Sequence, residues 1–575
     1  MQDRRGRIGT SRLRSLALVG TMMAVGLTAG CGAASDPATV TTRQFSPHRA
    51  PGVPRLSSLP SHAYVSGVLH AKGGQYLTDD LGRIVQLHGV NAVYKLAPYR
   101  MTVTPGQPNT LDDAEAARMA RLGFTAVRLG VLWEGIEPGT GGPNQPSICT
   151  PGDPGDPHMW NPTVARQYLA QVAQVVAALG RHHLYALIDM HQDVWNQLFS
   201  GEGMPQWATC TDGNPVTIYP GRWSENYSNP AVQASFNHLF NNDVVGNLQG
   251  EYQRAWSAIA TTFANNPWVM GYDPINEPAD YAPTVLHHHW YSTRLACMYA
   301  GSSGRARQVG MKQALPCPSN TPPSGVIQAI EERDHEHLVF PEMDNASHGR
   351  QPYLLGSLDL PKIVMNFHDY CAQRSGVTGN PTDLDACSGA ELATMVRRTQ
   401  ERDQMGSKVT PAGPAIFMTE FGATSSHNLA SQLAMDTTTL GLSWMWWSWR
   451  YYDDPTGSSA EALVGADGQL SPSATAITTT FPVAIAGTPL SSVLDPLDGQ
   501  YALTYLPNPK ITAPTTIFVS PSSYRTGYCT IVVGGSVTSK PGSGLLTISP
   551  STGADVTVVR IVPRACVGRT TPSKS

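Results

Sequence analysis

The sequence predicts an α/β fold, a (β/α)8 barrel followed by a C-terminal antiparallel β-sandwich domain. Between about residues 75 and 450, eight short apolar runs typical of strands alternate with helix-like runs, and such repeated alternation is typical of a parallel barrel. From about residue 486 onward, short apolar runs follow one another without a helical pattern, which indicates antiparallel sheets. In chain order we predict a signal peptide at 1–30, a flexible tether at 31–72, the barrel at 73–485, the sandwich at 486–568 and a tail at 569–575.

The N-terminal segment has the pattern of a bacterial export signal. A basic start with five arginines precedes an apolar stretch at 16–27, and small residues follow directly before Cys31. This order is typical of a secretory signal, and the apolar stretch is too short to span a membrane. The residues before Cys31 resemble a lipobox, in which the cysteine is lipidated, and an ordinary signal cleaved nearby is the alternative. We therefore expect a secreted or cell-surface lipoprotein. A tether rich in Ala, Ser, Thr and Pro would join Cys31 to the barrel.

Length and charge narrow the functional classes. A chain of 575 residues is long enough for two domains and a large core. Because the chain has 39 basic and 43 acidic residues, its net charge is close to zero, and there is no electrostatic case for nucleic-acid binding. Charged residues make up only 14% of the chain, while glycine and proline are plentiful, which favours long ordered loops on a rigid scaffold.

The cysteines indicate disulfides. Without Cys31, eight cysteines remain, and an even number in an exported chain favours disulfide bonds. Eight cysteines allow 105 connectivities, so the pairing stays open. A zinc cluster is the alternative, but no C-x2-C spacing is present. Their order suggests the local pairs Cys149–Cys210, Cys297–Cys317, Cys371–Cys387 and Cys529–Cys566.

The barrel elements are predicted from periodicity. Apolar residues recur at helical spacing over 164–179, with Gly180 as a C-terminal stop, and a shorter helix over 111–122 follows Thr110, with Asp113 completing a capping box. Long loops at 134–161, 194–231 and 279–324 follow strands, so we expect them to form walls around a pocket. The predicted strands are 84–90, 126–131, 184–190, 269–274, 337–340, 362–367, 415–419 and 441–447.

Two of these strands end in a glutamate. The run before Asn276, Glu277 and Pro278 and the run before Glu420 are both apolar and strand-like. Active sites of (β/α)8 barrels lie at the carboxyl ends of the strands, and a pair of carboxyl groups is what cleavage of a glycosidic bond requires. A single glutamate there is equally compatible with an ion pair. The two together, with polar residues at four other strand ends, favour one site.

These residues carry a family resemblance. The two glutamates and the polar and aromatic residues at the other strand ends resemble the eight-residue signature of glycoside hydrolase family 5 in clan A. This is a family of retaining glycosidases on a (β/α)8 barrel. The resemblance implies that Glu277 is the acid/base and that Glu420 is the nucleophile. The motifs at 86–95, 189–193, 203–208 and 482–489 are similar to those of endoglycoceramidases, which cleave between the glycan and the ceramide of glycosphingolipids. The signature residues are Arg128, His191, Asn276, Glu277, His368, Tyr370, Glu420 and Trp449.

The resemblance also implies roles for the residues around the glutamates. Tyr370 would hydrogen-bond the nucleophile, Arg128 would lie beneath it as a supporting residue, and Asn276 would bind the sugar 2-hydroxyl. Trp207 is the rival of Trp223 as a sugar platform. The mechanism requires no metal and no cofactor. The residues implied to bind substrate are Lys95, Asp189, His191, Asp193, Trp223, Asn276, His368, Tyr370 and Trp449.

The expected partners are a glycolipid or oligosaccharide and a membrane surface, reached through the lipid anchor and the substrate, and we expect a monomer. In the insert at 279–324, apolar side chains are either a wall for the lipid or the insert's own core. The adjacent histidines at 287–289 cannot all reach one ion from a helix, so a solvated face is favoured there. The insert's apolar residues are Leu286, Trp290, Leu295, Met298 and Tyr299.

Two other functions remain open from the sequence. The first is a glycosidase of the same clan that acts on another glycolipid or on a β-glucan. The second is a non-catalytic glycan- or lipid-binding lipoprotein on a barrel that has lost its activity. Both glutamates are intact, which argues against the second.

Overall fold

The structure is a computed structural model of the 575-residue chain. It describes residues 64–71, 74–139, 160–220, 223–244, 247–279, 285–303, 316–343, 358, 360–370, 398, 413–495 and 498–563, with side chains from residue 290 onward in the segment 285–303. Among these residues, no helix is both long and apolar enough to cross a membrane. The predicted signal peptide and nearly all of the tether lie outside the described residues.

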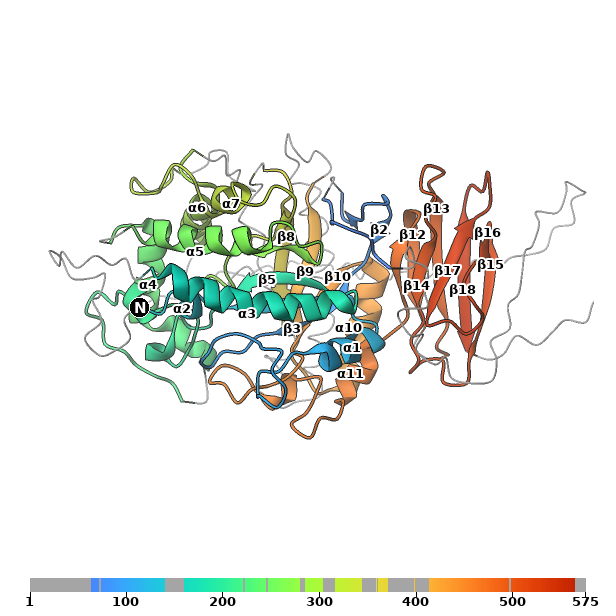
Figure 1. The fold of residues 1–575 in the computed structure, drawn as a ribbon, viewed down its shortest axis with the longest axis horizontal. Helices are drawn as coiled ribbons and strands as arrows, with labels where there is room; N and C mark the ends of the chain where they lie inside the picture. Colours follow the sequence, from blue (N-terminus) through green and yellow to red (C-terminus); the bar gives the residue numbers. More distant parts are fainter. Residues whose placement is uncertain are drawn as a thin grey trace, which may run out of the picture. The chain divides into compact units, whose positions relative to one another are not determined.

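Eight parallel strands form the barrel, as predicted (Figure 1). Each strand pairs with its neighbours in chain order, and the last strand pairs with the first. The isolated bridges Val339–Ile363 and Glu342–Asn366 link the two remaining edges, so the barrel closes. The strands are β3 (His88–Ala92), β4 (Ala126–Val131), β5 (Tyr185–Met190), β6 (Val269–Asp273), β7 (Leu338–Val339), β8 (Val364–Asp369), β9 (Ala415–Gly422) and β10 (Ser443–Trp447).

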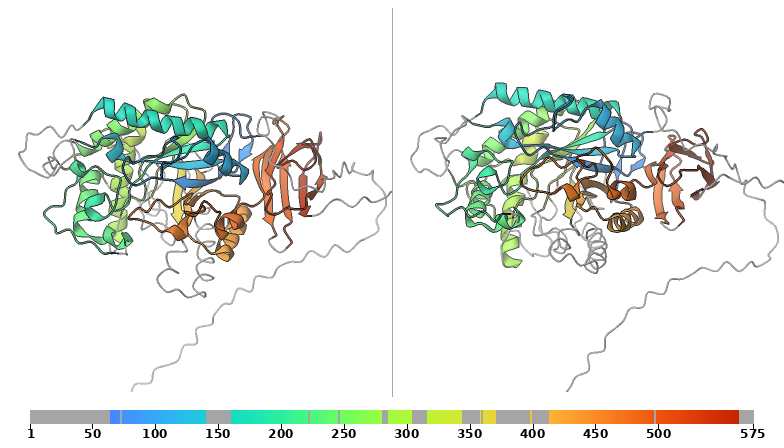
Figure 2. Two further views of the ribbon diagram at one scale, coloured as in Figure 1. Left: turned by 60° about the horizontal axis from the view of Figure 1, so that its bottom comes forward. Right: turned by 90° about the horizontal axis from the view of Figure 1, so that it is seen from below.

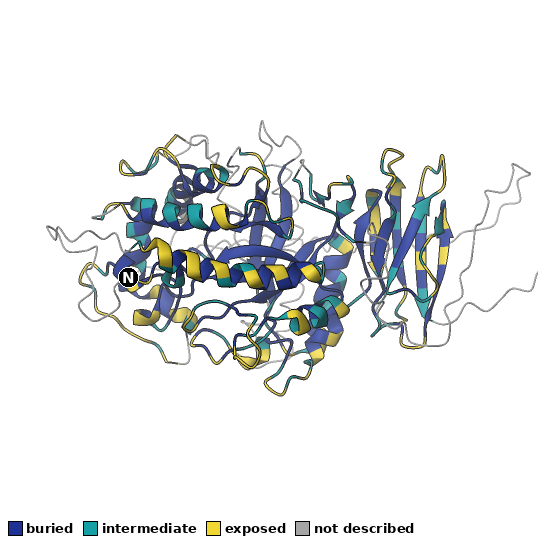
Figure 3. Cartoon of the chain, in the orientation of Figure 1, coloured by how far each residue is buried: buried dark blue, intermediate teal, exposed yellow. Residues whose placement is uncertain are grey.

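Helices cover the outside of the barrel. Figure 3 shows the expected amphipathic pattern on the longest of them, α3, with one exposed and one buried face. The helix continues through Gly180 and ends at Arg181, so Gly180 is not its stop. The described helices of at least four residues are α1 (Asp113–Arg121), α2 (Trp133–Ile136), α3 (Pro162–Arg181), α4 (Pro230–Asn241), α5 (Leu248–Phe263), α6 (Val285–Ala300), α7 (Val326–Glu331), α10 (His427–Leu440) and α11 (Pro472–Ile477).

The N-cap of α1 differs from the prediction. The Asp112 side chain accepts from the backbone N–H groups of Ala114 and Glu115, whereas Thr110 bonds within the preceding turn. A carboxylate that accepts two N–H groups satisfies the helix end, and its charge also suits the positive end of the helix dipole. The cap is therefore Asp112, and Thr110 was the wrong choice.

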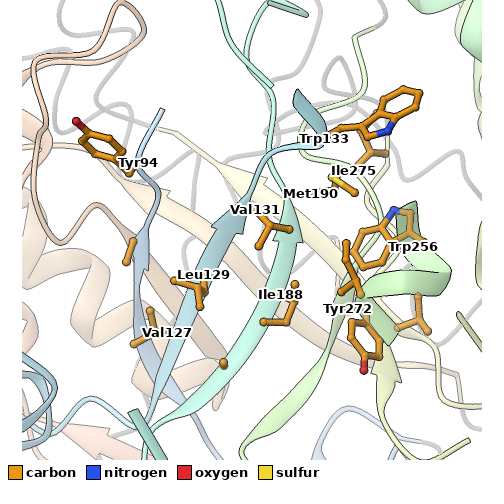
Figure 4. Packing of buried hydrophobic residues seen from close by; sticks show 14 of the residues in the cluster. Tyr94, Val127, Leu129, Val131, Trp133, Ile188, Met190, Trp256, Tyr272 and Ile275 are labelled. Carbon is orange, nitrogen blue, oxygen red and sulfur yellow. The ribbon is translucent and has the colours of Figure 1, made fainter. Parts of the chain in front are cut away.

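Strand alternation separates the apolar core from the polar interior of the barrel. In β4, Val127, Leu129 and Val131 share one face and are buried in the main hydrophobic cluster (Figure 4). Since successive side chains of a strand point to opposite faces, Arg128 points the other way, into the barrel. Tyr272 of β6 packs on Trp256 of α5, with 6.0 Å between ring centroids, so Asp273 faces the interior in the same manner.

The predicted strand at 84–90 is in fact two elements. Ile84 and Val85 form β2 (Ile84–Val85), which pairs antiparallel with β1 (Leu77–Thr78) and β11 (Phe481–Ile485). The barrel strand β3 starts only at His88. The continuous apolar run concealed this break, because periodicity does not distinguish one buried strand from two.

The C-terminal part is the predicted sandwich of two antiparallel sheets. One sheet has the order β1-β2-β11-β14-β17-β16 and the other the order β12-β13-β18-β15. The first sheet includes β1, β2 and β11, which we had assigned to the barrel. The remaining strands are β12 (Gly487–Leu494), β13 (Tyr501–Pro507), β14 (Thr515–Phe518), β15 (Tyr528–Val533), β16 (Gly535–Val537), β17 (Leu545–Pro550) and β18 (Thr557–Pro563).

The two domains share a junction at the amino ends of the barrel strands. Buried residues at these ends, such as Ala126 and Ala415, belong to one hydrophobic cluster with Phe481 and Phe518. In this junction the buried Arg83 donates to the carbonyl oxygens of Tyr64, at 2.5 Å, and Pro514, at 3.0 Å. The views of Figure 2 show β2 beside the C-terminal strands. The sandwich therefore lies at the end of the barrel away from the carboxyl ends of its strands.

The structure tests one of the four predicted disulfides directly. Cys297 and Cys317 are bonded, as predicted, and Cys210 and Cys529 are also disulfide-bonded. Cys31, Cys149, Cys371, Cys387 and Cys566 lie outside the described residues, so the other pairs stay predictions.

In the insert at 279–324, the buried residues belong to the main hydrophobic cluster. Leu295, Met298 and Tyr299 are fully buried, while Trp290 is partly buried against the same cluster. The three buried residues therefore pack in the protein's main core, and they form neither a wall for the lipid nor a separate core of the insert. The side chains of Leu286 and of the histidines at 287–289 lie outside the described residues.

Candidate active site

A pocket lies at the carboxyl ends of the barrel strands, where the sequence predicted it. Its lining comes from the ends of β9 and β10 and from the segments that follow β3, β5, β6 and β8. Both predicted catalytic glutamates line it, together with most of the residues predicted to bind substrate. The lining residues are Lys95, His191, Asp193, Trp223, Asn276, Glu277, Tyr370, Glu420, Ala423, Trp447, Thr456 and Glu461.

The two glutamates lie at the distance of a retaining glycosidase. A carboxylate oxygen of Glu277 and one of Glu420 are within 4.8 Å of each other. Retaining enzymes hold the two carboxyl groups about 5–5.5 Å apart, whereas inverting enzymes leave about 6.5–9.5 Å for a water molecule. His368 Nδ1 lies between the carboxyl groups, 2.8 Å from Glu277 Oε1 and 3.4 Å from Glu420 Oε2. The geometry favours direct attack by one carboxylate.

Glu420 receives hydrogen bonds at both carboxylate oxygens. The Arg128 guanidinium donates to Oε1 and the Tyr370 hydroxyl donates to Oε2. Burial raises the pKa of Glu420, while the neighbouring His368 and Arg128 oppose that rise. Hydrogen bonds to the charged form favour ionisation, so these donors fit a nucleophile that must be a carboxylate.

Arg128 connects the pair to the interior of the barrel. Its Nη2 lies 3.0 Å from Asp189 Oδ1, 2.9 Å from Asp273 Oδ2 and 2.9 Å from Asn276 Oδ1. All of these side chains are buried. A buried guanidinium requires such partners, since its charge is costly to remove from water. The supporting role expected for Arg128 therefore agrees with its contacts.

Glu277 has an unusual backbone that its neighbours fix. Its φ is 36°, in the left-handed region that non-glycine residues rarely adopt. Its N–H donates to Glu342 Oε2 at 2.9 Å. The Gln192 amide donates to the carbonyl oxygens of Asn276, at 2.8 Å, and Glu277, at 3.1 Å. Strained backbone persists only where surrounding contacts hold it, and these contacts set where the Glu277 carboxyl points.

A charged network forms another wall of the pocket. Lys95 Nζ donates to Asp193 and, at 2.9 Å, to the Thr456 hydroxyl, and lies 3.2 Å from Glu202. Burial opposes the charge of His191, but the carboxylates of Asp189 and Asp193 raise the pKa of His191 to about 10. In the same network Lys95 and His191 lower the pKa of Asp193 despite its burial. Fixed donors and acceptors of this kind suit sugar hydroxyl groups.

Three described groups of side chains have the spacing of metal ligands. In the group His191–Asp193–Glu202, the Lys95 ammonium lies 3.2 Å from Glu202 and bonds Asp193, so the protein itself already supplies a cation. In the group Cys210–Asp212–His238, Cys210 is disulfide-bonded and offers no thiolate. The group Glu277–His368–Glu420 contains the carboxyl pair, which His368 already bridges. The groups are Glu277–His368–Glu420, His191–Asp193–Glu202 and Cys210–Asp212–His238.

Of the tryptophans at the end of β10, the one that lines the pocket is Trp447, not Trp449. The Trp447 ring stacks on His191 with 5.4 Å between centroids, and its indole N–H donates to Glu461 Oε2 at 3.0 Å. Trp449 is fully buried, and its N–H donates to Glu115 Oε2 at 2.7 Å. The predicted strand 441–447 already ended where β10 ends, at Trp447. Trp449 was chosen from the family resemblance, whereas the residue at the strand end is the one that reaches the pocket.

The two candidates for a sugar platform are now separated. Trp223 lines the pocket. Trp207 is buried, and its indole N–H donates to the Glu137 carbonyl oxygen at 2.9 Å. Trp223 therefore lies at the pocket and Trp207 does not, while the role of Trp223 as a sugar platform stays a prediction.

Two further residues predicted to bind substrate do not line the pocket. Asp189 is fully buried and bonds Arg128 and, at 2.8 Å, His191 Nδ1. His368 is also fully buried, behind the glutamates, with Nε2 3.0 Å from Glu342 Oε1. Their direct contact with substrate stays a prediction, since each side chain points into the barrel and contacts a residue that does line the pocket.

Sequence reasoning missed several residues of the site. Glu342 follows β7 as Glu277 follows β6, and its position after a short apolar run and Pro341 was a signal that could have been used. Trp447 was identifiable only from the end of β10. Thr456 and Glu461 come from the segment after β10, where nothing in the pattern marks them.

Comparisons with known proteins agree with this geometry. Residues 83–453 match the family model "Cellulase (glycosyl hydrolase family 5)", and residues 480–562 match "Glycoside hydrolase family 5 C-terminal domain". The chain is 27% identical over 502 residues to Endoglycoceramidase I of Rhodococcus hoagii (strain 103S), covering 84% of this chain and 86% of the relative.

Solved structures of similar fold include Endo-glycoceramidase II from Rhodococcus sp. in two states. The ganglioside GM3 complex has a TM-score of 0.65 at 23% identity, covering 85% of this chain and 100% of the other. The lactosyl-enzyme intermediate has a TM-score of 0.62 at 23% identity, covering 86% and 100%. At this identity the likeness concerns the fold. Since the family model spans most of the barrel and the pocket holds the paired glutamates, the chain belongs to glycoside hydrolase family 5.

Proposed function

We propose that the protein is a retaining endo-glycosidase that hydrolyses the β-glycosidic bond between the oligosaccharide and the ceramide of glycosphingolipids. The observation that carries this proposal is the pair of carboxylate oxygens within 4.8 Å of each other in the pocket. Relatives named as endoglycoceramidases support the substrate class. The donors and acceptors of Lys95, His191 and Asp193 supply one polar wall for a glycan.

In the first step, Glu420 attacks the anomeric carbon as a carboxylate. Its charge is favoured by Arg128 and Tyr370, which donate to its two oxygens. Glu277 gives its proton to the glycosidic oxygen, so the ceramide leaves as a neutral alcohol while a covalent glycosyl-enzyme forms. His368 Nδ1 lies 2.8 Å from Glu277 Oε1 and is placed to orient that carboxyl group.

In the second step, water cleaves the glycosyl-enzyme. Glu277 is now ionised and takes a proton from the water molecule, which attacks the same anomeric carbon and releases Glu420. Two displacements restore the original configuration of the sugar. Asn276 lines the pocket beside the pair, where its amide suits the sugar 2-hydroxyl, a contact that strengthens as the transition state forms.

The decisive experiment is release of intact oligosaccharide from detergent-solubilised lactosylceramide or GM3 ganglioside. We expect the wild type to release the glycan with retained configuration. Glu277→Gln and Glu420→Gln should each lower turnover by several orders of magnitude without unfolding the protein. Near-wild-type turnover in Glu420→Gln would reject the proposed nucleophile, and an inverted product would reject the mechanism.

The alternative is a retaining β-glycosidase of the same clan that acts on another glycolipid or on a β-glucan. It uses the same two glutamates, so the carboxylate variants do not separate the two proposals. Parallel assays with a soluble β-glucan and with a monoglycosylated lipid do so. Hydrolysis of either, without cleavage of lactosylceramide, would establish the alternative.

We also propose that the protein is exported and carries a lipid on Cys31. The support is the basic and apolar start of the chain and the small residues before Cys31. Mass spectrometry of the protein purified from its own membranes should show a lipidated Cys31 as the first residue. Cys31→Ala should then move the protein from the membrane fraction to the medium, and an unmodified mature N-terminus elsewhere would refute lipidation.

A further inference from the structure

The exposed large aliphatic side chains of the described residues are unevenly distributed. Four lie in the segments after β3 and β5. The other six lie on or next to the strands of one sheet of the sandwich, β12-β13-β18-β15. They reach 56% exposure at Leu490 and 51% at Val533. The six are Leu490, Val493, Leu506, Ile531, Val533 and Val556.

Strand register shows that most of these aliphatic side chains share the outer face of the sheet, together with the exposed Thr488 and Ser491. Val493 is opposite Ala502, Ala502 is opposite Arg560, and Arg560 is opposite Ile531, so one row crosses all four strands. The residues between them in sequence, such as Val532, are buried against the other sheet. Figure 3 shows the resulting alternation of exposed and buried positions along these strands.

The chemistry of this outer face does not suit a sugar. Carbohydrate platforms use aromatic rings, and the tyrosines of these four strands, Tyr501, Tyr505 and Tyr528, are buried inside the sandwich. Arg560 is the only charged residue in the four strands. A face with several exposed aliphatic side chains and a single cation in its strands instead suits the interfacial region of a lipid layer.

The charge of the domain points to an anionic layer. Residues 486–568 contain five basic and three acidic residues, a net charge of +2, while the whole chain has a net charge of −4. No acidic residue follows Asp555, whereas Arg560, Arg564, Arg569 and Lys574 do. Basic clusters are attracted to anionic lipid headgroups, and each cation near the surface adds to binding.

The start of the described chain lies next to the same domain. The carbonyl oxygen of Tyr64 accepts from Arg83, which also donates to Pro514 at the beginning of β14. Only residues 32–63 separate Tyr64 from Cys31, and that length of chain spans at most about 110 Å. A lipid on Cys31 would therefore be within reach of the surface that this domain touches.

We propose that the outer face of the β12-β13-β18-β15 sheet docks on an anionic lipid surface. This inference goes beyond the proposed catalytic function and does not depend on it. The sandwich lies at the amino ends of the barrel strands, whereas the pocket lies at their carboxyl ends. A docked molecule thus contacts the lipid through the domain that does not contain the pocket.

Vesicle flotation of the full chain tests the proposal. Cys31→Ser is introduced throughout, so that no attached lipid contributes, and the vesicles are phosphatidylcholine with or without phosphatidylglycerol. The test variant is Ile531→Ser with Val533→Ser. The matched control is Leu198→Ser with Val216→Ser, which removes two aliphatic side chains of similar exposure, 43% and 39%, from the segment after β5.

We expect the parent protein and the control to float with vesicles that contain phosphatidylglycerol, and the test variant to bind about tenfold more weakly or worse. Binding should weaken in high salt and with phosphatidylcholine alone. Unchanged thermal unfolding of both variants confirms that they are folded. Absence of binding to anionic vesicles would overturn the proposal, as would a loss confined to the control variant. The proposal would also be overturned if the protein formed a dimer without lipid and the Ile531→Ser, Val533→Ser variant did not. The face would then bind a second copy of the chain.

Discussion

Tyr370→Phe tests how the nucleophile is kept charged. The substitution removes only the hydroxyl group that donates to Glu420 Oε2 and leaves the ring in place. A hydrogen bond to a charged group contributes about 1.5–3 kcal/mol, which corresponds to roughly a 10- to 150-fold change in an equilibrium or rate. Because burial already raises the pKa of Glu420, loss of the donor should raise it further.

The assay is kcat/KM for a soluble aryl lactoside across the acidic pH range. Glu420 reacts as a carboxylate, so kcat/KM falls as the pH drops through its pKa. Without the Tyr370 hydroxyl, this acidic limb should move to higher pH by about 1–2 units. At the pH optimum, kcat/KM should fall by at least about tenfold.

A matched substitution separates this effect from general loss of stability. Tyr528→Phe also removes a hydroxyl group from a buried tyrosine, one that donates to the Ser543 carbonyl oxygen at 2.7 Å in the sandwich. It should leave the pH profile unchanged. If Tyr370→Phe behaves like Tyr528→Phe, with kcat/KM within about twofold of wild type and no displaced limb, Tyr370 does not maintain the charge of Glu420.

Three further predictions address other parts of the molecule. Trp447→Ala should raise KM for the glycan, whereas Trp449→Phe should lower the thermal midpoint at unchanged KM; the reverse result would restore Trp449 as the sugar-binding residue. The pKa of His191, raised to about 10 by carboxylates, predicts stability that is fully present below about pH 6.5 and lost as the pH rises to 10. Urea unfolding should show this loss, and a flat profile would contradict it. Replacing both Cys297 and Cys317 by serine should lower the free energy of unfolding by about 3 kcal/mol, given their separation of 20 residues. An unchanged urea midpoint would show that this disulfide does not stabilise the fold.

The sequence predicts best where a local pattern and a structural rule agree. The strand at 126–131 was predicted to the residue, because its apolar run is bounded on both sides. Glu277 and Glu420 were found because each directly follows such a run, and barrel topology brings the carboxyl ends of all strands together. The pairing of Cys297 with Cys317 followed from their proximity in sequence.

The errors at the site arose where a residue was taken from the family resemblance and not from its place in a strand. Four tryptophans occur between 444 and 449, and the predicted strand ended at Trp447, as β10 does, yet Trp449 was chosen. Similarly, Asp189 belongs to the interior of β5, where it bonds Arg128. Glu342 was missed because β7 has only two residues and offers almost no periodicity to detect.

The mixed sheet at the domain junction has a consequence for dissecting the enzyme. In that sheet β2 and β11 pair with each other, and β11 also pairs with β14 of the C-terminal part. A truncation before β14 would leave β11 with an open edge and remove Phe518 from the cluster beneath the barrel, and open edges of this kind recruit other chains. Expression of the catalytic part alone should therefore yield aggregates, so libraries and crystals have to be prepared from both domains as one piece.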